Sequence, residues 1–476
     1  MVSQASLSIG FAAGVASHVA HFNRYEHHFY GIKYLQAFIL IFVTFTAKLN
    51  MYDHEPFVKA FAHVFWLASC YITGIYLSLV SYRILFSPLR NFPGPFGAKI
   101  SNFWFSSQLR KHDAHKKLIA LHEQYGDFVR IGSSDLSIVH PEAVQAIYGF
   151  GSKCTKADWY DLTHPMISMQ TTRDRTLHDE RRRIWSVAFS DRALRGYEQR
   201  IKTYQNQLTA QFFAFGGQSI NVTKWFTLYS WDVMGDLAYS MSFHMLEKSE
   251  EHWAVKLLNE GMEPMGWMFP TWFFRVLTAI PFAARGWWRF IGFCCEKLDE
   301  RRKMKVDVPD IMSALLEPWK DKTLSGSDLS ILQGDSQLII VAGSDTTATT
   351  LTHLIYELVR NPSQLSKLRD EILPIVTEKG EIPHVKLQYL EHLNAAINET
   401  LRLHPPVGTA LQRLTPPEGL NIGTTYIPGN TTVWCPQYVI GRDEKIYADA
   451  LSFVPERWYA RPEMIKKAGA FAPFSA

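Results

Sequence analysis

The stretch Leu332-Gln-Gly-Asp-Ser-Gln-Leu-Ile-Ile-Val-Ala-Gly-Ser-Asp-Thr-Thr-Ala-Thr-Thr-Leu351 predicts a long, mostly apolar helix over residues 332–360. In its middle, Asp345 and Thr346 stand side by side just after Gly343. A carboxylate in a helix that looks buried is costly unless it is paired or takes part in chemistry. The threonine hydroxyl can bond to a carbonyl one turn earlier and bend the helix, and glycine lets another group approach the backbone. We therefore expect a helix that opens locally to admit a small polar guest beside a proton source.

Length and composition are those of a large globular protein. The chain has 476 residues, of which 47% are hydrophobic, 14% aromatic and only 20% charged. This composition supplies a large core and argues against disorder. The net charge is +4 and no basic run is interleaved with aromatic residues, so we expect no nucleic-acid partner. The five cysteines have no zinc-type spacing, and their odd number indicates reduced thiols.

The first 86 residues predict membrane segments. From Ala60 to Tyr82, 23 residues carry no formal charge, which is enough to cross a bilayer core that needs about 20. Residues 34–47 would be a second span or an interfacial helix, and residues 5–22 are less apolar still, so the span count stays between one and three. The basic residues Arg83, Arg90 and Lys99 follow the long segment and predict a cytoplasmic flank. A buried core helix is the alternative interpretation of residues 60–82.

The rest of the chain predicts a mainly α fold with a small β portion. Pro93-Gly94-Pro95 makes a stiff turn, so we expect a hinge over residues 87–97 between the anchor and a globular domain over residues 98–476. The expected elements are a helix ending near Tyr125, a hairpin over 128–131 and 136–139, a helix opened by Pro141-Glu142 at its first position, helices over 176–302 and 332–404, and short strands within 420–435.

Glu399 and Arg402 form a candidate buried ion pair. They are three residues apart and share a helix face. Such pairs are common on surfaces, where they contribute about 0–1 kcal/mol. Here the neighbours are apolar, which favours burial, and a buried pair needs further hydrogen-bonding partners. Arg457, in Pro455-Glu-Arg-Trp458, could supply one.

The order of these motifs resembles the cytochrome P450 family of heme-thiolate monooxygenases. Asp345-Thr346, Glu399-x-x-Arg402, Pro455-Glu-Arg-Trp458 and Phe471-Ala-Pro-Phe474 follow one another as in that family, and the resemblance runs from about Pro93 to the last residue. It implies the cytochrome P450 fold behind N-terminal transmembrane helices. It also implies heme b (iron protoporphyrin IX), activation of O2, and hydroxylation or a related oxidation of an apolar organic substrate.

The resemblance assigns roles to several residues. Ala342-Gly-Ser-Asp-Thr-Thr347 matches the family's helix motif, which implies that Gly343 lies against the distal face of the heme and that Asp345 and Thr346 deliver protons. A kinked core helix with Thr346 bonded back to its own backbone is the alternative. Glu399, Arg402 and Arg457 resemble the family's structural triad.

A second set of residues is expected to hold the heme propionates. His178-Asp-Glu-Arg-Arg-Arg-Ile-Trp185 matches the family's His-x-x-x-Arg helix, and it puts His178 and Arg182 one turn apart on one face. Arg413 would act in the same way, since a guanidinium suits carboxylate geometry. Arg181 and Arg183 are expected on the surface. The Met- and aromatic-rich stretch 262–274 predicts either core packing or an apolar lid over the substrate or membrane.

Partners and location follow from the same resemblance. No Gly-x-Gly-x-x-Gly motif follows a strand, so electrons must come from another protein, by resemblance an NADPH-cytochrome P450 reductase. We expect attachment to the endoplasmic reticulum membrane with the catalytic domain in the cytoplasm, in a eukaryotic, fungal type of secondary metabolism.

The family's ligand loop reads Phe-x-x-Gly-x-Arg-x-Cys, and Phe474-Ser475-Ala476 supplies its first three positions. In this register the axial cysteine falls five residues after Ala476, so no metal ligand is assigned within the sequence. Because the thiolate favours O–O cleavage, we expect the chain as written to be inactive. Either the sequence is an incomplete copy of a functional enzyme, or the protein is a non-catalytic membrane-bound fragment or binding module.

Overall fold

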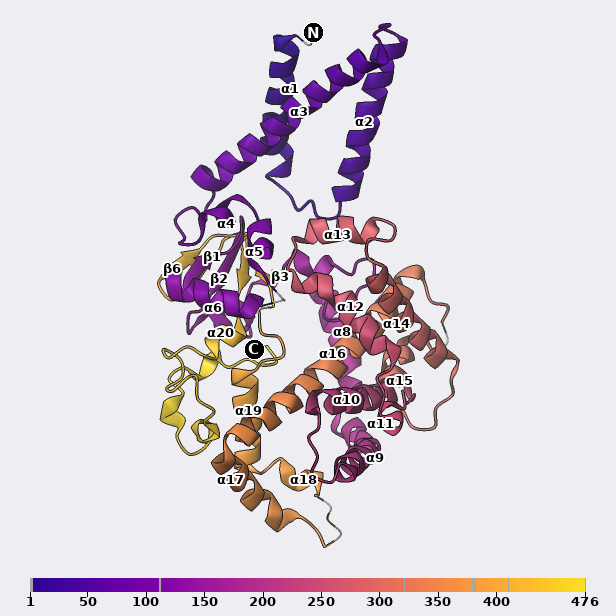
Figure 1. Cartoon of the computed structure of the whole chain (residues 1–476), viewed down its shortest axis with the longest axis vertical. Helices are drawn as coiled ribbons and strands as arrows, with labels where there is room; N and C mark the ends of the chain where they lie inside the picture. Colours follow the sequence, from indigo (N-terminus) through magenta and orange to yellow (C-terminus); the bar gives the residue numbers. More distant parts are fainter. Residues whose placement is uncertain are drawn as a thin grey trace. The chain divides into compact units, whose positions relative to one another are not determined.

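Helices dominate the chain, and short strands occur where turn residues break the helical pattern (Figure 1). The structure is a computed structural model, and it describes residues 3–110, 113–320, 322–378, 380, 382–409 and 411–475. It divides into two compact units. The first holds residues 1–112, 128–136 and 264–284, and the second holds residues 113–127, 137–263 and 285–476.

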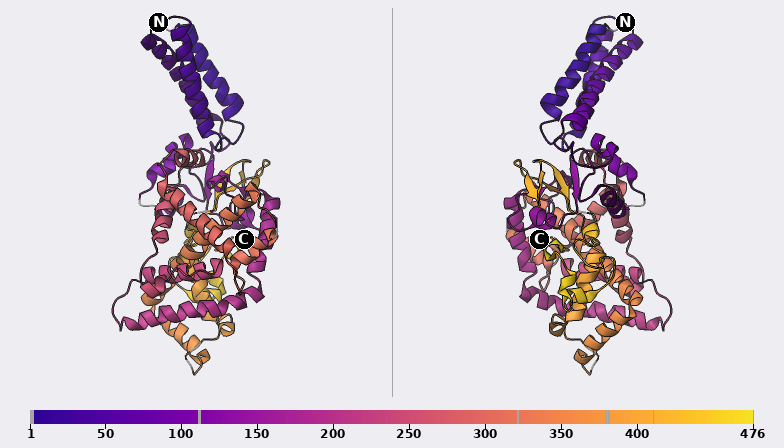
Figure 2. Two further views of the ribbon diagram at one scale, coloured as in Figure 1. Left: turned by 90° about the vertical axis from the view of Figure 1, so that its right-hand side faces the viewer. Right: turned by 90° about the vertical axis from the view of Figure 1, so that its left-hand side faces the viewer.

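The first unit contains the apolar helices predicted at the N-terminus. Its elements are α1 (Gln4–Ser17) continued by a π-helical turn (His18–Phe22), α2 (Gly31–Met51), α3 (Phe57–Ser81) continued by a second π-helical turn (Tyr82–Phe86), α4 (Phe96–Ile100), α5 (Phe103–Gln108), β1 (Phe128–Arg130) and α13 (Thr271–Ala279). Three helical segments, Gln4–Phe22, Gly31–Met51 and Phe57–Phe86, are long and apolar enough to cross a membrane. Side views show them side by side as a bundle (Figure 2).

The Pro93-Gly94-Pro95 turn is packed against the strand β1. The backbone N–H of Arg130 donates to the carbonyl of Pro93 at 2.7 Å. Gly94 has a φ of 154°, and a Cβ there would lie 2.3 Å from the carbonyl oxygen of Arg130. Only glycine fits this close approach of two backbones. The turn therefore lies within the first unit.

The second unit carries the remaining elements. Its helices are α6 (Ala114–Tyr125), α7 (Ala143–Tyr148), α8 (Arg175–Ala188), α9 (Asp191–Ala214), α10 (Val222–Tyr239), α11 (Met245–Lys248), α14 (Arg285–Lys303), α15 (Ile311–Leu316), α16 (Gly326–Arg360), α17 (Pro362–Ile372), α18 (His384–Leu387), α19 (Glu391–Leu403) and α20 (Gln437–Ile440). Its strands are β3 (Thr155–Lys156), β4 (Arg413–Leu414), β5 (Leu420–Ile422), β6 (Thr425–Ile427) and β7 (Thr432–Trp434). The helix α12 (Trp253–Gly266) and the strand β2 (Asp135–Ile138) lie across the boundary between the units.

The predicted mainly α fold is confirmed, including the β1–β2 hairpin, the short strands and the helix that ends at Tyr125. One boundary was wrong. We expected Pro141 at the first position of the next helix, but α7 begins at Ala143 because residues 141 and 142 form a turn before it. A single proline signal does not separate a first helical turn from a preceding β-turn, since proline suits both.

The long helix α16 is fixed at both ends by local sequence. At its start, Ser325 accepts a hydrogen bond from the backbone N–H of Asp328 (3.2 Å), and Asp328 accepts one from the backbone N–H of Ser325 (3.0 Å). This reciprocal capping box begins the helix. Its end at Arg360 precedes Asn361-Pro362, where the proline disfavours a helical conformation for the residue before it.

Two short strand pairings position the charged residues of the candidate site. β3 pairs with β4 in antiparallel fashion and β4 pairs with β7. The register places Lys156 of β3 directly opposite Arg413 of β4. Like charges opposite each other in a sheet are destabilising, so this pair needs an anion or another compensating contact.

Candidate active site

The middle of α16 is open on one side. Ala342, Gly343, Asp345 and Thr347 are exposed, whereas Ser344, which lies between them, and Ala348, which follows them, are buried. The buried side packs on α10, where the Ser230 hydroxyl donates to the carbonyl oxygen of Ser344 at 2.6 Å. The centre of the longest helix therefore leaves a polar surface uncovered.

Asp345 lies on the open side of α16. Its side chain is exposed, whereas Asp335, another acid of the same helix, is fully buried. Surrounding protein nevertheless raises the pKa of the Asp345 carboxyl through desolvation.

Thr346 is bonded to its own helix, and Gly343 faces α10. The Thr346 hydroxyl donates to the carbonyl oxygen of Ala342 at 2.7 Å, which is the back-bonding that the kinked-core alternative expected. A Cβ at Gly343 would lie 3.1 Å from Cγ of Met234, so the glycine leaves room for this side chain of α10. Thr346 is thus back-bonded within a helix whose neighbouring residue, Asp345, is exposed.

A cationic cavity of about 210 Å³ lies in the second unit. Its basic lining residues are Lys156, Arg173, Arg175, His178 and Arg413. Two of the residues predicted to hold propionates, His178 and Arg413, therefore meet at one cavity. Lys156 and Arg173 were not predicted from the sequence.

The contacts in this cavity leave positive charge in excess. Arg173 pairs with Asp161 at 2.8 Å, and His178 Nδ1 lies 2.9 Å from the Asp179 carboxylate. Arg413 donates to the Tyr160 hydroxyl at 2.7 Å, and Lys156 donates to the carbonyl of Met169 at 3.0 Å. Burial and then the charge of Arg413 lower the pKa of Lys156 to about 8. A bound carboxylate would relieve both effects.

The arginine run of α8 differs from the prediction at one position. Arg181, expected on the surface, is buried and ion-paired with Asp335 of α16. Arg182 and Arg183 are exposed, and Arg182 is absent from the described residues that line the cationic cavity. The prediction for Arg181 was wrong because Arg181 and Arg182 are both within one turn of His178, and only the packing of α16 decides which one is buried.

Glu399, Arg402 and Arg457 form one buried cluster. The Glu399 carboxylate lies 2.7 Å from Nη2 of Arg402 and 3.0 Å from Nε of Arg457. It also accepts hydrogen bonds from the indole N–H of Trp458 and the backbone N–H of Val454, each at 2.9 Å. This carboxylate therefore has the additional donors that a buried ion pair requires.

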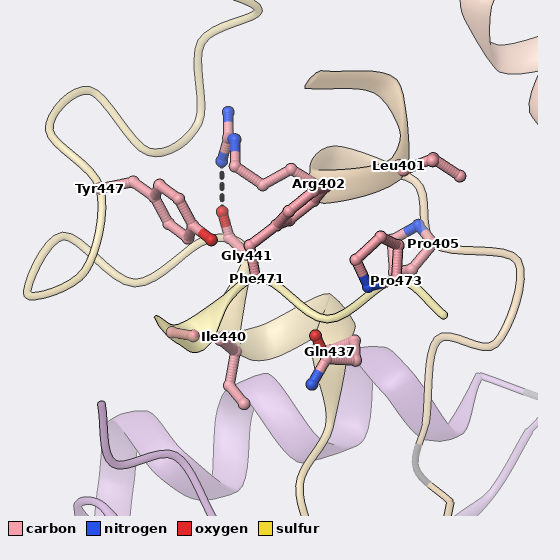
Figure 3. Close-up of a pocket in the computed structure, with 10 residues that line it drawn as sticks. Leu401, Arg402, Pro405, Gln437, Ile440, Gly441, Tyr447, Phe471 and Pro473 are labelled. Carbon is pink, nitrogen blue, oxygen red and sulfur yellow. Dashed lines mark hydrogen bonds between the residues drawn. The ribbon is translucent and has the colours of Figure 1, made fainter. Parts of the chain in front are cut away.

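The stretch that matches the start of the ligand loop lies beside this cluster. Phe471 and Pro473 line a small pocket with Arg402 and Tyr447 (Figure 3). Arg402 donates there to the carbonyl of Gly441, and the ring of Phe471 contacts Trp458 with centroids 4.4 Å apart. The last predicted position, Ala476, lies outside the described residues.

Four cysteines lie outside the apolar N-terminal helices: Cys154, Cys294, Cys295 and Cys435. Burial raises the pKa of each of these thiols. The register of the ligand-loop motif assigns none of them as the axial cysteine.

Comparisons with known proteins identify the family. The Cytochrome P450 family model matches residues 93–476. The chain is 45% identical over 463 residues to Cytochrome P450 monooxygenase notG' of Aspergillus versicolor, covering 97% of this chain and 85% of that protein. It is 45% identical over 471 residues to Tryprostatin B 6-hydroxylase of Aspergillus fumigatus, covering 97% of this chain and 84% of that protein. It is 39% identical over 487 residues to Cytochrome P450 monooxygenase lcsK of Purpureocillium lilacinum, covering 100% of this chain and 87% of that protein. The family implies a heme cofactor and a redox partner. The chain belongs to the cytochrome P450 family of monooxygenases.

Proposed function

We propose that the protein uses O2 to hydroxylate an apolar organic molecule of fungal secondary metabolism. The observation that carries the proposal is the open acid–alcohol face of α16, within a chain that matches the family over residues 93–476. A relative named for a hydroxylation, Tryprostatin B 6-hydroxylase, favours this type of oxidation. The alternative, a non-catalytic binding module, has no comparable support, and the predicted inactivity of the chain as written stays a prediction.

The cationic cavity fits the carboxylates of a heme. Lys156 and Arg413 face each other in register, and Lys156 has a pKa of about 8 in the absence of an anion. Two propionates would supply the missing negative charge. We propose that His178, Arg413 and Lys156 hold them, and that Arg182, exposed on the same helix as His178, reaches the heme edge.

When bound, the heme supplies the activation of dioxygen. Asp345 and Thr346 then serve as proton carriers from the protein side. The raised pKa of Asp345 allows its carboxyl to take up a proton closer to neutral pH than an ordinary aspartic acid. The Thr346 hydroxyl donates its hydrogen to Ala342, so its oxygen can accept a hydrogen bond from a water while keeping that contact. A rotation of the hydroxyl away from Ala342 would let it donate instead.

The other site residues act through position. Gly343 leaves room for the Met234 side chain of α10, and the Ser230 hydroxyl from α10 satisfies the carbonyl of Ser344 next to it. Glu399, Arg402 and Arg457 hold α19 to the Pro455–Trp458 turn, next to the stretch that matches the start of the ligand-loop motif. We assign this cluster to folding and heme-pocket support.

The redox partner is proposed to be an NADPH-cytochrome P450 reductase. The apolar helices favour membrane attachment, and we propose the endoplasmic reticulum with the catalytic domain on the cytoplasmic side. In domain terms, residues 1–86 would be the anchor, residues 87–97 the connection, and residues 98–476 the catalytic domain.

Isotope labelling tests the function. Membranes with the full-length holoenzyme and a fungal reductase would be given NADPH, ¹⁸O2 and a panel of apolar alkaloids. We expect a product with one labelled oxygen atom that needs both proteins. A product labelled from water would contradict oxygen insertion from O2, and turnover without the reductase would contradict the partner.

A further inference from the structure

The helix α1 is tightly packed against α3, although it is the least apolar of the three N-terminal segments. A Cβ at Gly14 would lie 2.1 Å from the carbonyl oxygen of Tyr71, and one at Gly74 would lie 2.2 Å from the carbonyl oxygen of Phe11. Both glycines therefore let one helix backbone touch the other. Close backbone approach at small residues is how helices associate within a bilayer, where no hydrophobic effect drives them together.

Polar side chains of α1 and its continuation are satisfied by α3. His18 Nδ1 lies 2.9 Å from the Ser78 hydroxyl, and the Tyr71 hydroxyl donates to Ser17 at 3.1 Å. His18 is only 2% exposed. In hydrocarbon such groups need protein partners, and these two bonds provide them. They explain how a segment that contains serine and histidine can stay inside a membrane. They also explain why hydropathy alone makes this segment look less suited to span a membrane than its contacts indicate.

The contacts also fix the direction of the helices. Positions 10, 14 and 18 of the first segment meet positions 67, 71 and 78 of the third, so the two run parallel. α2 lies antiparallel to α3, since residues 52–56 connect them and the rings of Phe42 and Phe61 are 5.3 Å apart. The three segments therefore alternate in direction, which puts the N-terminal end of α1 at the same end of the bundle as residues 52–56 (Figure 2).

Residues 23–30 lie at the other end, beside α13, which in turn contacts α5. The Arg275 guanidinium of α13 lies 4.6 Å from the ring centroid of Phe29, and Trp272 of α13 contacts Phe103 of α5 with centroids 5.7 Å apart. Charge follows the same division. This end carries the basic residues Arg24, Lys33, Arg83, Arg90 and Lys99 with one acid, Glu26, whereas the far end has two basic residues, Lys48 and Lys59, with Asp53 and Glu55. The positive-inside rule assigns the more basic end to the cytoplasm.

We propose that the anchor is a three-span bundle whose N-terminus and residues 52–56 lie on the lumenal side, while residues 23–30 return to the cytoplasmic side and hold α13. This topology rests on the membrane attachment proposed above and specifies it. A single span at residues 60–82 would instead leave residues 4–51 free of the bilayer and all on one side of it.

A disulfide cross-link tests the α1–α3 contact. A Cβ at Gly10 would lie 3.8 Å from Cβ of the native Cys70, which matches the mean separation of about 3.8 Å in disulfides. We would make Gly10→Cys in the full chain, add a protease site within residues 52–56, and oxidise the membranes. The expected result is two cleaved fragments that separate only after reduction. Cys70→Ser in the same background should abolish the link, and Ala13→Cys, on the exposed side of α1, should not form it. Absence of the Gly10→Cys link, or an equal link from Ala13→Cys, would overturn the bundle.

Glycosylation acceptors test the sidedness. An Asn-x-Thr acceptor on an N-terminal extension or on an extended 52–56 loop should be modified in microsomes, and one inserted within residues 23–30 should not. The native acceptors at Asn221, Asn398 and Asn430 should stay unmodified, which checks the cytoplasmic side independently. Modification of the 23–30 acceptor, or none at the other two, would contradict three spans. Extraction of the intact chain from the membrane by carbonate would instead contradict membrane attachment itself. A failure of the three-span topology can therefore be told apart from a failure of the proposed attachment.

Discussion

The guanidinium of Arg181 in α8 is ion-paired with the carboxylate of Asp335 in α16, and both side chains are almost completely buried. Asp335 also accepts a hydrogen bond from the backbone N–H of Met169 at 3.1 Å, and Arg181 lies over the ring of Trp319 at 5.0 Å. The pair joins the helix that carries His178 to the helix that carries Asp345. It therefore connects the expected propionate side of the site to the expected proton relay.

Removing one partner of this pair should destabilise the second unit strongly. Asp335→Asn leaves the Arg181 charge buried without a counter-charge, which costs about 3–5 kcal/mol of unfolding free energy. Urea unfolding of the detergent-solubilised protein, followed by protease susceptibility, would measure the loss. The matched control is Arg183→Gln, an exposed position of the same run, for which we expect a change within about 0.5 kcal/mol. The double variant Arg181→Met with Asp335→Leu should recover most of the loss, and an equal loss in the double variant would mean that packing rather than charge is responsible.

The sequence predicted those features that depend on local signals. The long helix, the hairpin and the Glu399–Arg402 contact each follow from spacing within a few residues, and the structure has all three. Arg181 could not be chosen over Arg182 in this way, because both lie within one turn of His178 and a distant element, α16, supplies the acid that pairs with Arg181. Lys156 stands in a two-residue strand whose place is set by pairing with β4, more than 250 residues later in the chain. Burial decided by distant partners is not visible in a local pattern.

Glu399 should be the least replaceable acid of α19. Glu399→Gln replaces one carboxylate oxygen by an NH2 group, which donates hydrogen bonds and cannot accept them. The groups around it on Arg402, Arg457 and Trp458 are also donors, so some of their hydrogen bonds would be lost. We expect a loss of at least about 3–5 kcal/mol, seen as rapid proteolysis of residues 113–475 and low yield. Glu391→Gln, at the exposed start of the same helix, should cost less than about 1 kcal/mol. Comparable proteolysis of the two variants would contradict a special role for the cluster.

The relay residues should separate oxygen use from product formation. In the full-length holoenzyme, Thr346→Ala removes the hydroxyl beside Asp345, and we expect NADPH and O2 to be consumed with more peroxide and less product. Asp345→Asn cannot carry a proton and should slow turnover, by about 10²-fold or more if it acts as a general acid. Thr350→Ala is the matched control, because Thr350 makes the same type of back-bond, to Thr346 at 2.9 Å, one turn further along. Unchanged coupling in Thr346→Ala together with an unchanged rate in Asp345→Asn would support the kinked-helix alternative.

Lys156 should make the heme-free protein more stable in alkali. Burial first, and Arg413 second, lower the pKa of Lys156 to about 8 from an ordinary 10.5. Between these two pH values the unfolded chain binds more protons than the folded one, so the free energy of unfolding rises with pH across this window. Lys156→Gln should flatten the rise and should stabilise the heme-free protein below pH 8, where the wild type carries an unfavourable charge opposite Arg413.

Lys153→Gln is the control, since Lys153 is exposed and its 3.0 Å pair with Glu418 contributes little. The measurement is the urea midpoint across the window for the three proteins, and a rise of the same size in Lys156→Gln would show that another group causes it.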